Sequence, residues 1–335
     1  MMFANSSIAA ALSDFGVCPL LGQSGGTFWL PPPRSTTAEV VDSLFYFIFA
    51  VSAFFFILIV ALMILFVILY RRRPGVEPQG TTHHNTALEL IWTIIPLAIV
   101  MVIFYWGFTA YMDMRTSPRE SYEIRVVGQK WSWLFKYPNG YVDSELHVPV
   151  AKPVRLIMTS EDVIHSLFIP AFRVKMDLVP GRYTQTWFHA VEPGSYDLYC
   201  AEYCGTGHSD MLSKVVVHEP GTFETWLENA GNLLATMTPV EAGETLYRRR
   251  GCGQCHSTDG TARAGGGPTF QGIYGQTHQM TDGSRVEVED NYIRESILEP
   301  QAKIRAGYEP IMPTYKGQLS DEEITAIIEF IKSLE

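Results

Sequence analysis

Residues 43–70 read SLFYFIFAVSAFFFILIVALMILFVILY, twenty-eight consecutive positions without one charged side chain. A second uncharged run, LIWTIIPLAIVMVIFYWGFTAYM, covers the twenty-three positions 90–112. A helix needs about 20 residues to cross the roughly 30 Å hydrocarbon core of a bilayer. Helices buried in soluble proteins seldom run beyond about 20 residues. The two runs therefore predict a hairpin of transmembrane helices within residues 40–114.

The composition of the whole chain agrees with a protein that lies partly in lipid. Of its 335 residues, 47% are hydrophobic and 18% are charged, against about 25% charged in typical soluble proteins. The net charge of −10 argues against a nucleic-acid partner, which needs clustered Lys and Arg. At roughly 150 residues per domain, the length corresponds to about two soluble domains.

The charges beside the apolar runs predict their orientation in the membrane. Three arginines at positions 71–73 make the loop between the runs the more basic side. By the positive-inside tendency this loop is cytoplasmic, which places both chain termini on the outer side of the membrane. Residues 1–39 have a weak apolar hump and no basic residue before Arg34. Cleavage of this segment and lipid attachment at Cys18 both stay open.

Glu89 lies at the cytoplasmic mouth of the second run. One interpretation is an interfacial carboxylate that the dipole at a helix N-terminus stabilises. The other is an entrance to a proton path, since ionisable side chains in membrane segments are commonly functional. The residues alone favour the first interpretation and leave the second open.

Residues 120–218 show short alternating segments separated by turn residues. β-branched and aromatic residues are frequent, and Pro or Gly recurs about every dozen positions, which is typical of an antiparallel sandwich or barrel. The expected strands include residues 123–127, 131–137, 154–159, 183–189 and 195–199.

The densest group of metal-binding residue types lies near the end of this segment, in CAEYCGTGHSDM at positions 200–211. The soft ligands in it are Cys200, Cys204, His208 and Met211. Such ligands suit copper better than hard cations, and His165 is the most plausible further imidazole. A blue-copper site needs one Cys, whereas two thiolates can bridge two copper ions. A disulfide or a structural zinc site are the alternatives, and both leave the methionine without a role.

A third segment begins near residue 240, after a polar connection over residues 219–239. Residues 240–250 read as a helix that leads directly into Cys252-Gly253-Gln254-Cys255-His256. Cys-x-x-Cys-His is the attachment signal for c-type haem, with the adjacent imidazole as proximal ligand. A thioredoxin-like redox pair is the alternative, but it expects a strand before the motif within a βαβ pattern.

An electron-transfer haem takes a second axial ligand, and a thioether raises its potential. Met312 lies in a Pro-flanked loop before the helix expected over residues 320–334, and Met280 and His278 are its competitors. This arrangement resembles class I cytochrome c, in which a Met-Pro loop precedes the C-terminal helix, and the resemblance favours Met312. Residues 240–335 carry fifteen acidic and ten basic side chains. This surface either attracts a basic electron donor or only keeps the domain soluble.

With these motifs the chain resembles subunit II of the haem-copper cytochrome c oxidases over residues 40–218, followed by a domain that resembles class I cytochrome c. The resemblance rests on the helix hairpin, the Cys-x3-Cys-x3-His-x2-Met loop and the upstream histidine. It implies a cupredoxin-like fold and a binuclear copper centre, CuA. The implied copper ligands are the side chains of His165, Cys200, Cys204, His208 and Met211 and the backbone carbonyl of Glu202. The Glu202 side chain resembles a ligand to a magnesium ion shared with the catalytic subunit.

The same resemblance implies roles for other positions. Trp131, in the run GQKWSW at 128–133, resembles the aromatic residue through which electrons reach the copper. Its alternative is an ordinary strand residue on the same face as Trp133. Glu89 matches the carboxylate at the entrance of a K-type proton channel, which reverses the preference stated above. Pro268 resembles the proline whose carbonyl supports the proximal imidazole.

The expected protein is therefore the electron-input subunit of a bacterial membrane cytochrome c oxidase with a fused cytochrome c. Electrons would pass from external cytochrome c or a similar donor through haem c to CuA. They would continue to a haem in catalytic subunit I, where O2 is reduced to water and protons are translocated. Subunit III is a further expected partner. The rival from another class is a membrane-tethered electron carrier that serves no oxidase.

The expected architecture is multidomain: a two-helix transmembrane hairpin, an all-β cupredoxin-like sandwich and an all-α cytochrome c domain. Its expected parts are an N-terminal segment 1–39, the hairpin 40–114 with helices at about 43–70 and 90–112, the copper domain 120–218, a linker 219–239 and the haem domain 240–335.

Overall fold

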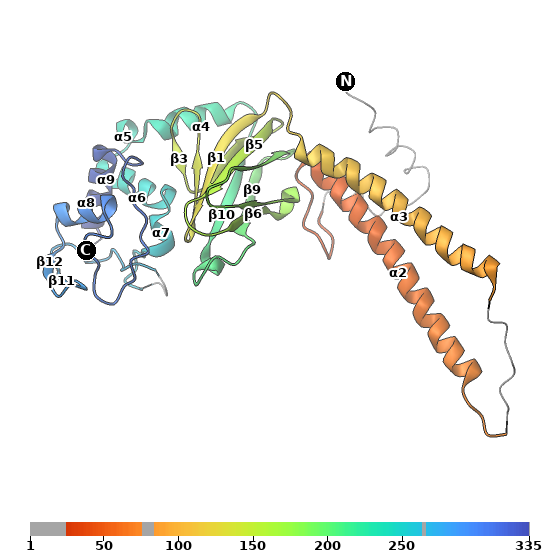
Figure 1. The fold of residues 1–335 in the computed structure, drawn as a ribbon. Helices are drawn as coiled ribbons and strands as arrows, with labels where there is room; N and C mark the ends of the chain where they lie inside the picture. The colour runs from red at the N-terminus through yellow and green to blue at the C-terminus, as the bar shows by residue number, and fades with distance from the viewer. Residues whose placement is uncertain (1–24, 76–83, 263–265, 335) are drawn as a thin grey trace. The chain divides into compact units, whose positions relative to one another are not determined.

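The computed structural model describes residues 25–75, 84–262 and 266–334, so the N-terminal apolar hump and Cys18 lie outside the described residues. The chain forms two compact units, Met1–Pro33 with Thr37–Thr116, and Arg34–Thr36 with Ser117–Glu335. The two long helices belong to the first unit, and the regions expected to bind copper and haem belong to the second (Figure 1).

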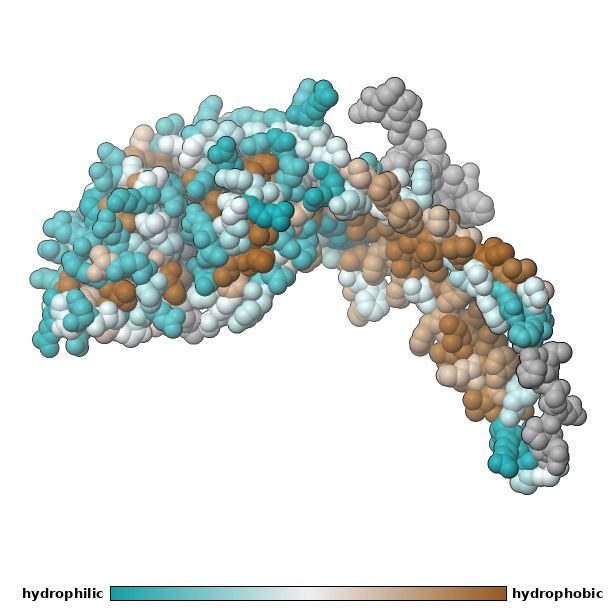
Figure 2. All heavy atoms as spheres, in the orientation of Figure 1, coloured by the Kyte–Doolittle hydropathy of each residue, from teal (hydrophilic) through white to brown (hydrophobic). Residues whose placement is uncertain are grey.

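The first unit is a hairpin of two long helices, α2 (Thr36–Tyr70) and α3 (Thr86–Arg115). Both are long and apolar enough to cross a membrane, and their apolar windows are not buried inside the protein. Figure 2 shows the hydrophobic surface that covers these helices. Phe47 of α2 packs against Trp106 of α3, and their ring centroids are 5.6 Å apart. Both helices begin before the uncharged runs, because polar residues at a helix start can lie outside the apolar part.

The copper domain is a sandwich of two five-stranded sheets, ordered β3-β2-β1-β5-β8 and β4-β10-β9-β6-β7. The strands are β1 (Tyr122–Gln129), β2 (Ser132–Lys136), β3 (Val142–Asp143), β4 (Leu146–Pro149), β5 (Pro153–Ser160), β6 (His165–Ile169), β7 (Val174–Leu178), β8 (Thr184–His189), β9 (Gly194–Cys200) and β10 (Leu212–His218). Alternate residues of β5 are buried, as expected for a strand with one face toward the core. Fully buried side chains from both sheets, including Trp133, Phe188 and Leu198, form one core.

The sandwich is confirmed, but its pairing is not purely antiparallel. β1 pairs with β5 and β4 pairs with β10 in parallel, whereas the other pairs in the two sheets are antiparallel. Alternation along a strand reports which face is buried and carries no information on the direction of the neighbouring strand.

A helix from the connecting segment packs on the copper domain. This helix, α4 (Thr222–Gly231), is followed by the short α5 (Leu233–Thr236). Phe223 is buried, and the Trp226 ring stacks on His147 of β4 with centroids 3.9 Å apart. The connection is therefore held against the sandwich over its first half.

The haem domain contains α6 (Pro239–Arg249), α7 (Cys252–Cys255), α8 (Asp290–Leu298) and α9 (Asp321–Lys332). Capping boxes at Thr238 and Ser320 start α6 and α9. A hairpin of β11 (Thr277–Gln279) and β12 (Arg285–Glu287) also lies here, so the domain is not entirely helical. Strands of three residues are too short for their alternation to be detected in a sequence.

Replacing Gly243 with Ala should strongly destabilise the haem domain, because α6 and α9 touch at this glycine. A Cβ added there would lie 2.0 Å from the Ala326 carbonyl oxygen of α9. Backbone must move to relieve such a contact, so we expect a loss of about 3 kcal/mol or more. Thermal unfolding, followed by the haem absorbance, measures this loss of stability. Gly231→Ala in α4 is the control, because its nearest atom would be 3.9 Å away; equal melting of the two variants would contradict the prediction.

Candidate functional site

Strand pairing brings the predicted copper ligands together. Cys200 ends β9, and Leu167 of β6 pairs with it, so His165 at the start of β6 lies beside the 200–211 loop. The ligand atoms of His165, Cys200 and Cys204 lie within 4.8 Å of one another, and all three residues are buried. The two sulfur atoms are 3.8 Å apart, and both cysteines are free.

The remaining predicted copper ligands surround the same two thiols. His208 Nδ1 lies 3.5 Å from Cys204 Sγ, and Met211 Sδ lies 3.8 Å from that sulfur. On the other side, His165 Nδ1 lies 3.9 Å from Cys200 Sγ. The Glu202 carbonyl oxygen is 3.3 Å from Cys200 Sγ, while the Glu202 residue is exposed. Each sulfur thus has one imidazole and one weak ligand beside it, a donor set suited to a pair of copper ions.

The electrostatics of the two thiols fit a bound cation. Burial and the neighbouring Cys200 raise the pKa of Cys204 to about 12. Burial acts to raise the pKa of Cys200 too, but hydrogen bonds from His165 and the Ser166 backbone outweigh it, so the pKa is about 6. A negative charge on one sulfur therefore disfavours ionisation of the other, and two thiolates at this spacing need positive charge between them.

Asp162 orients the His165 ring. Its Oδ1 lies 2.8 Å from His165 Nε2, which leaves Nδ1 directed toward Cys200. Its Oδ2 accepts a hydrogen bond of 2.7 Å from the backbone N–H of Lys130. A carboxylate that binds the outer nitrogen fixes both the tautomer and the direction of a metal-binding histidine. Asp162 was not among the residues predicted from the sequence; its position three residues before His165 was the available signal.

Trp131 lies directly on the 200–211 loop. Its indole N–H donates to the Cys204 carbonyl oxygen at 3.1 Å. A Cβ added to Gly207 would lie 2.5 Å from the indole, so only glycine lets the loop backbone approach this closely. Trp131 precedes β2 and is half-buried, whereas Trp133 is fully buried within β2. The two tryptophans are therefore not the equivalent strand residues of the alternative interpretation.

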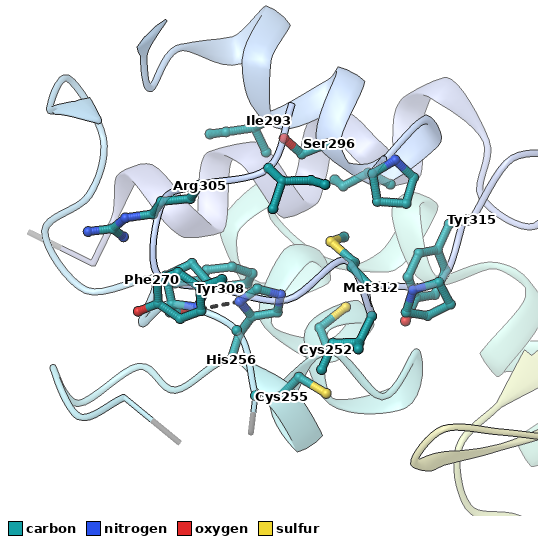
Figure 3. Close-up of a pocket in the computed structure, with 18 of the residues that line it drawn as sticks. Cys252, Cys255, His256, Phe270, Ile293, Ser296, Arg305, Tyr308, Met312 and Tyr315 are labelled. Carbon is teal, nitrogen blue, oxygen red and sulfur yellow. Dashed lines mark hydrogen bonds between the residues drawn. The ribbon is translucent and has the colours of Figure 1, made fainter. Parts of the chain in front are cut away.

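The Cys-x-x-Cys-His motif borders a largely apolar cavity in the haem domain (Figure 3). His256 is buried, and its Nδ1 lies 2.8 Å from the Pro268 carbonyl oxygen, which leaves Nε2 free to bind a metal. The Phe270 ring stacks on the imidazole with centroids 4.4 Å apart. A Cβ at Gly267 would lie 2.3 Å from the imidazole ring, so the backbone at this position packs directly against His256.

The cavity distinguishes among the three candidates for the second axial ligand. Met312 lines it together with Cys252, Cys255 and His256, and Figure 3 shows these side chains around one space. Met280 and His278 are not among the described residues that line the cavity. Met280 is buried behind this lining, with its sulfur 4.0 Å from the hydroxyl of the lining residue Tyr292. The arrangement fits an iron held between His256 and Met312.

Glu89 lies in the first turn of α3. Its carboxylate accepts a hydrogen bond of 3.4 Å from the Asn85 backbone N–H and lies 3.8 Å from His84 Nδ1. These contacts are those of a carboxylate at a helix N-terminus.

Comparisons with known proteins follow the same three-part division. Family models match for the transmembrane domain of cytochrome c oxidase subunit II over residues 24–109, for its periplasmic domain over 139–219 and for cytochrome c over 240–335. The cytochrome c oxidase subunit 2 of Alkalihalophilus pseudofirmus is 31% identical over 276 residues, which are 79% of this chain and 78% of that protein. The subunit 2 of Thermostichus vulcanus is 47% identical over 104 residues, 31% of this chain and 32% of that protein.

A solved structure also matches this chain. The periplasmic domain of subunit II of cytochrome oxidase of Bradyrhizobium japonicum is 34% identical to it. The match covers 35% of this chain and 98% of that one, with a TM-score of 0.33.

Proposed function

The chain belongs to the cytochrome c oxidase subunit 2 family, as an electron-input subunit with a fused cytochrome c domain, and we propose which residues hold each cofactor. It is a membrane protein with two transmembrane helices and a domain of the periplasmic type. The rival carrier that serves no oxidase is set aside by this membership.

The proposed copper ligands are those brought together by the 200–211 loop and β6. They are the side chains of His165, Cys200, Cys204, His208 and Met211 and the carbonyl oxygen of Glu202. Bound copper supplies a one-electron redox couple there. Asp162 holds the His165 imidazole in its binding orientation, and Trp131 connects the loop to the domain surface through the Cys204 carbonyl. The observation that carries the assignment is the pair of free buried thiols, each beside its own imidazole.

The proposed haem ligands lie around the cavity of the haem domain. Cys252 and Cys255 would form the thioether bonds to the haem, and His256 and Met312 would bind its iron. Support for Met312 comes from its place in the cavity, and support for His256 from its hydrogen bond to Pro268. The apolar lining excludes water, which with the thioether keeps the potential of a bound haem high.

Membership of the subunit 2 family supports the proposed partners. A haem-copper oxidase catalytic subunit I accepts electrons from the copper domain, and subunit III completes the complex. An external cytochrome c or similar donor reduces the haem domain, which its acidic surface favours. Both soluble domains lie on the outer side of a bacterial membrane, as the basic residues 71–73 between the helices support.

Two acidic residues have further proposed roles. Glu202 is exposed, and its side chain is available to hold a magnesium ion with groups of the catalytic subunit. Glu89 is proposed to stand at the entrance of a K-type proton channel; its contacts with Asn85 and His84 are also compatible with a capping role.

Optical spectra and cofactor counting on the purified full chain test the proposal. We expect a copper pair with a near-infrared band and a single covalent c-type haem. Covalent haem without copper would overturn the copper assignment, because the sandwich would then carry only an empty or oxidised pair of thiols. Copper without covalent haem would overturn the role of Cys252 and Cys255.

A further inference from the structure

The copper domain binds the end of a helix that belongs to the haem domain. Ser144, in the turn between β3 and β4, donates from its backbone N–H to the Arg249 carbonyl oxygen at 2.6 Å. Its hydroxyl donates to the Arg248 carbonyl oxygen at 3.0 Å. These carbonyls lie at the C-terminal end of α6, where the last carbonyl groups of a helix lack the usual i+4 partners; the Arg248 carbonyl also accepts from the Gly251 backbone N–H at 3.3 Å. Ser144 therefore caps α6 from another domain.

A buried carboxylate lies beside this contact. Asp143 is 1% exposed and accepts a hydrogen bond of 2.7 Å from the Tyr141 hydroxyl. Arg249 donates to the same hydroxyl at 3.0 Å, and its Nε lies 3.9 Å from Asp143 Oδ2. A buried carboxylate is costly unless positive charge and hydrogen bonds offset its desolvation. The haem domain supplies that positive charge through Arg249.

The position of Arg249 connects this contact to the redox sites. It precedes Cys252 by only three residues. Beyond it, the Gln254 amide donates to the Leu212 carbonyl oxygen at 3.4 Å, next to the copper ligand Met211. Lys130 and Ser132, on either side of Trp131, line the haem cavity.

We propose that Asp143, Ser144 and Arg249 form a latch that holds the haem domain against the Trp131 side of the copper domain. They are positioning residues for the internal electron transfer, an inference that rests on the proposed cofactor ligands. One electron leaves the haem domain, which is oxidised, and enters the copper domain, which is reduced; no proton or further reactant is needed. The connecting chain keeps the domains near each other, and the latch fixes their orientation.

Variants of the latch in the assembled oxidase test the proposal. Arg249→Gln removes the cation from a side chain that is 28% exposed, so it leaves no buried cavity. Asp143→Asn keeps the size and the oxygen that accepts from Tyr141, and it replaces the oxygen that accepts from the Glu145 backbone N–H with an amide NH2. We expect amide hydrogen exchange at Ser144 to become about tenfold faster, because the loss of one charge-assisted hydrogen bond has about this effect.

Electron transfer from the haem domain to the copper domain, started by rapid reduction of the haem domain, should slow by about tenfold. The haem and copper spectra should not change. Arg249→Lys should give an intermediate rate.

Arg248→Gln is the matched control. The Arg248 side chain is 73% exposed and pairs with Glu244 of its own helix, while its carbonyl remains available to Ser144. Its exchange and transfer rates should stay at the wild-type values. Wild-type rates in both Arg249→Gln and Asp143→Asn, or equal slowing in Arg248→Gln, would overturn the latch. A wild-type chain whose haem domain never reduces its copper domain would overturn the proposed function instead.

Discussion

Replacing either Cys200 or Cys204 with Ser should abolish the mixed-valence copper signal while covalent haem stays in place. Both sulfur atoms lie within the ligand group, 3.8 Å apart, so each variant removes one of the two proposed bridges. A hydroxyl is a harder ligand that does not ionise at neutral pH, and it cannot replace a bridging thiolate. Removing a group that only orients a ligand lowers metal affinity by about 10–100-fold, and losing a bridge should cost more.

Electron paramagnetic resonance, the near-infrared band and copper content per covalent haem measure this effect. Tyr203→Phe is a control within the same loop, because its side chain is exposed and keeps its ring beside His208. That variant should retain the full copper signal. An unchanged copper spectrum in either serine variant would contradict the binuclear assignment.

Replacing Met312 with Ala should open the haem iron to added ligands. Met312 is the candidate thioether that lines the haem cavity, and alanine is too short to reach an iron held by His256. We expect rapid binding of carbon monoxide to the reduced protein and a lower reduction potential, since a thioether ligand raises the potential. The wild-type haem should resist carbon monoxide.

Met280→Ala is the informative comparison. Met280 is 2% exposed and lies outside the cavity lining, so its truncation should cost about 2–5 kcal/mol of stability and leave the iron six-coordinate. If Met312→Ala still excludes carbon monoxide while Met280→Ala admits it, the axial ligand has been assigned to the wrong methionine.

Features encoded in contiguous residues were predictable from the sequence. The uncharged run 43–70 is long enough to cross a bilayer, and this prediction needs no other part of the chain. The whole run lies within α2. The sandwich followed from alternation, because a strand with one buried face must repeat every two residues. The copper loop and the haem motif were recognisable because their ligand types lie within a few positions of one another.

The parallel pairs β1–β5 and β4–β10 were not predictable in this way, since alternation does not encode a neighbour's direction. Asp162 was missed because carboxylates near a histidine are common, and only the fold shows which one binds the ring.

The sequence by itself determined the class of each part: helices for the membrane, a sandwich with a soft-metal loop and a domain with a haem attachment motif. The tertiary structure alone decided which distant residues meet. His165 reaches Cys200 through the pairing of β6 with β9, Met312 enters the cavity while Met280 does not, and Ser144 caps the helix that ends at Arg249. Local patterns fix local structure, whereas these contacts depend on strand pairing and side-chain packing between segments far apart in the chain.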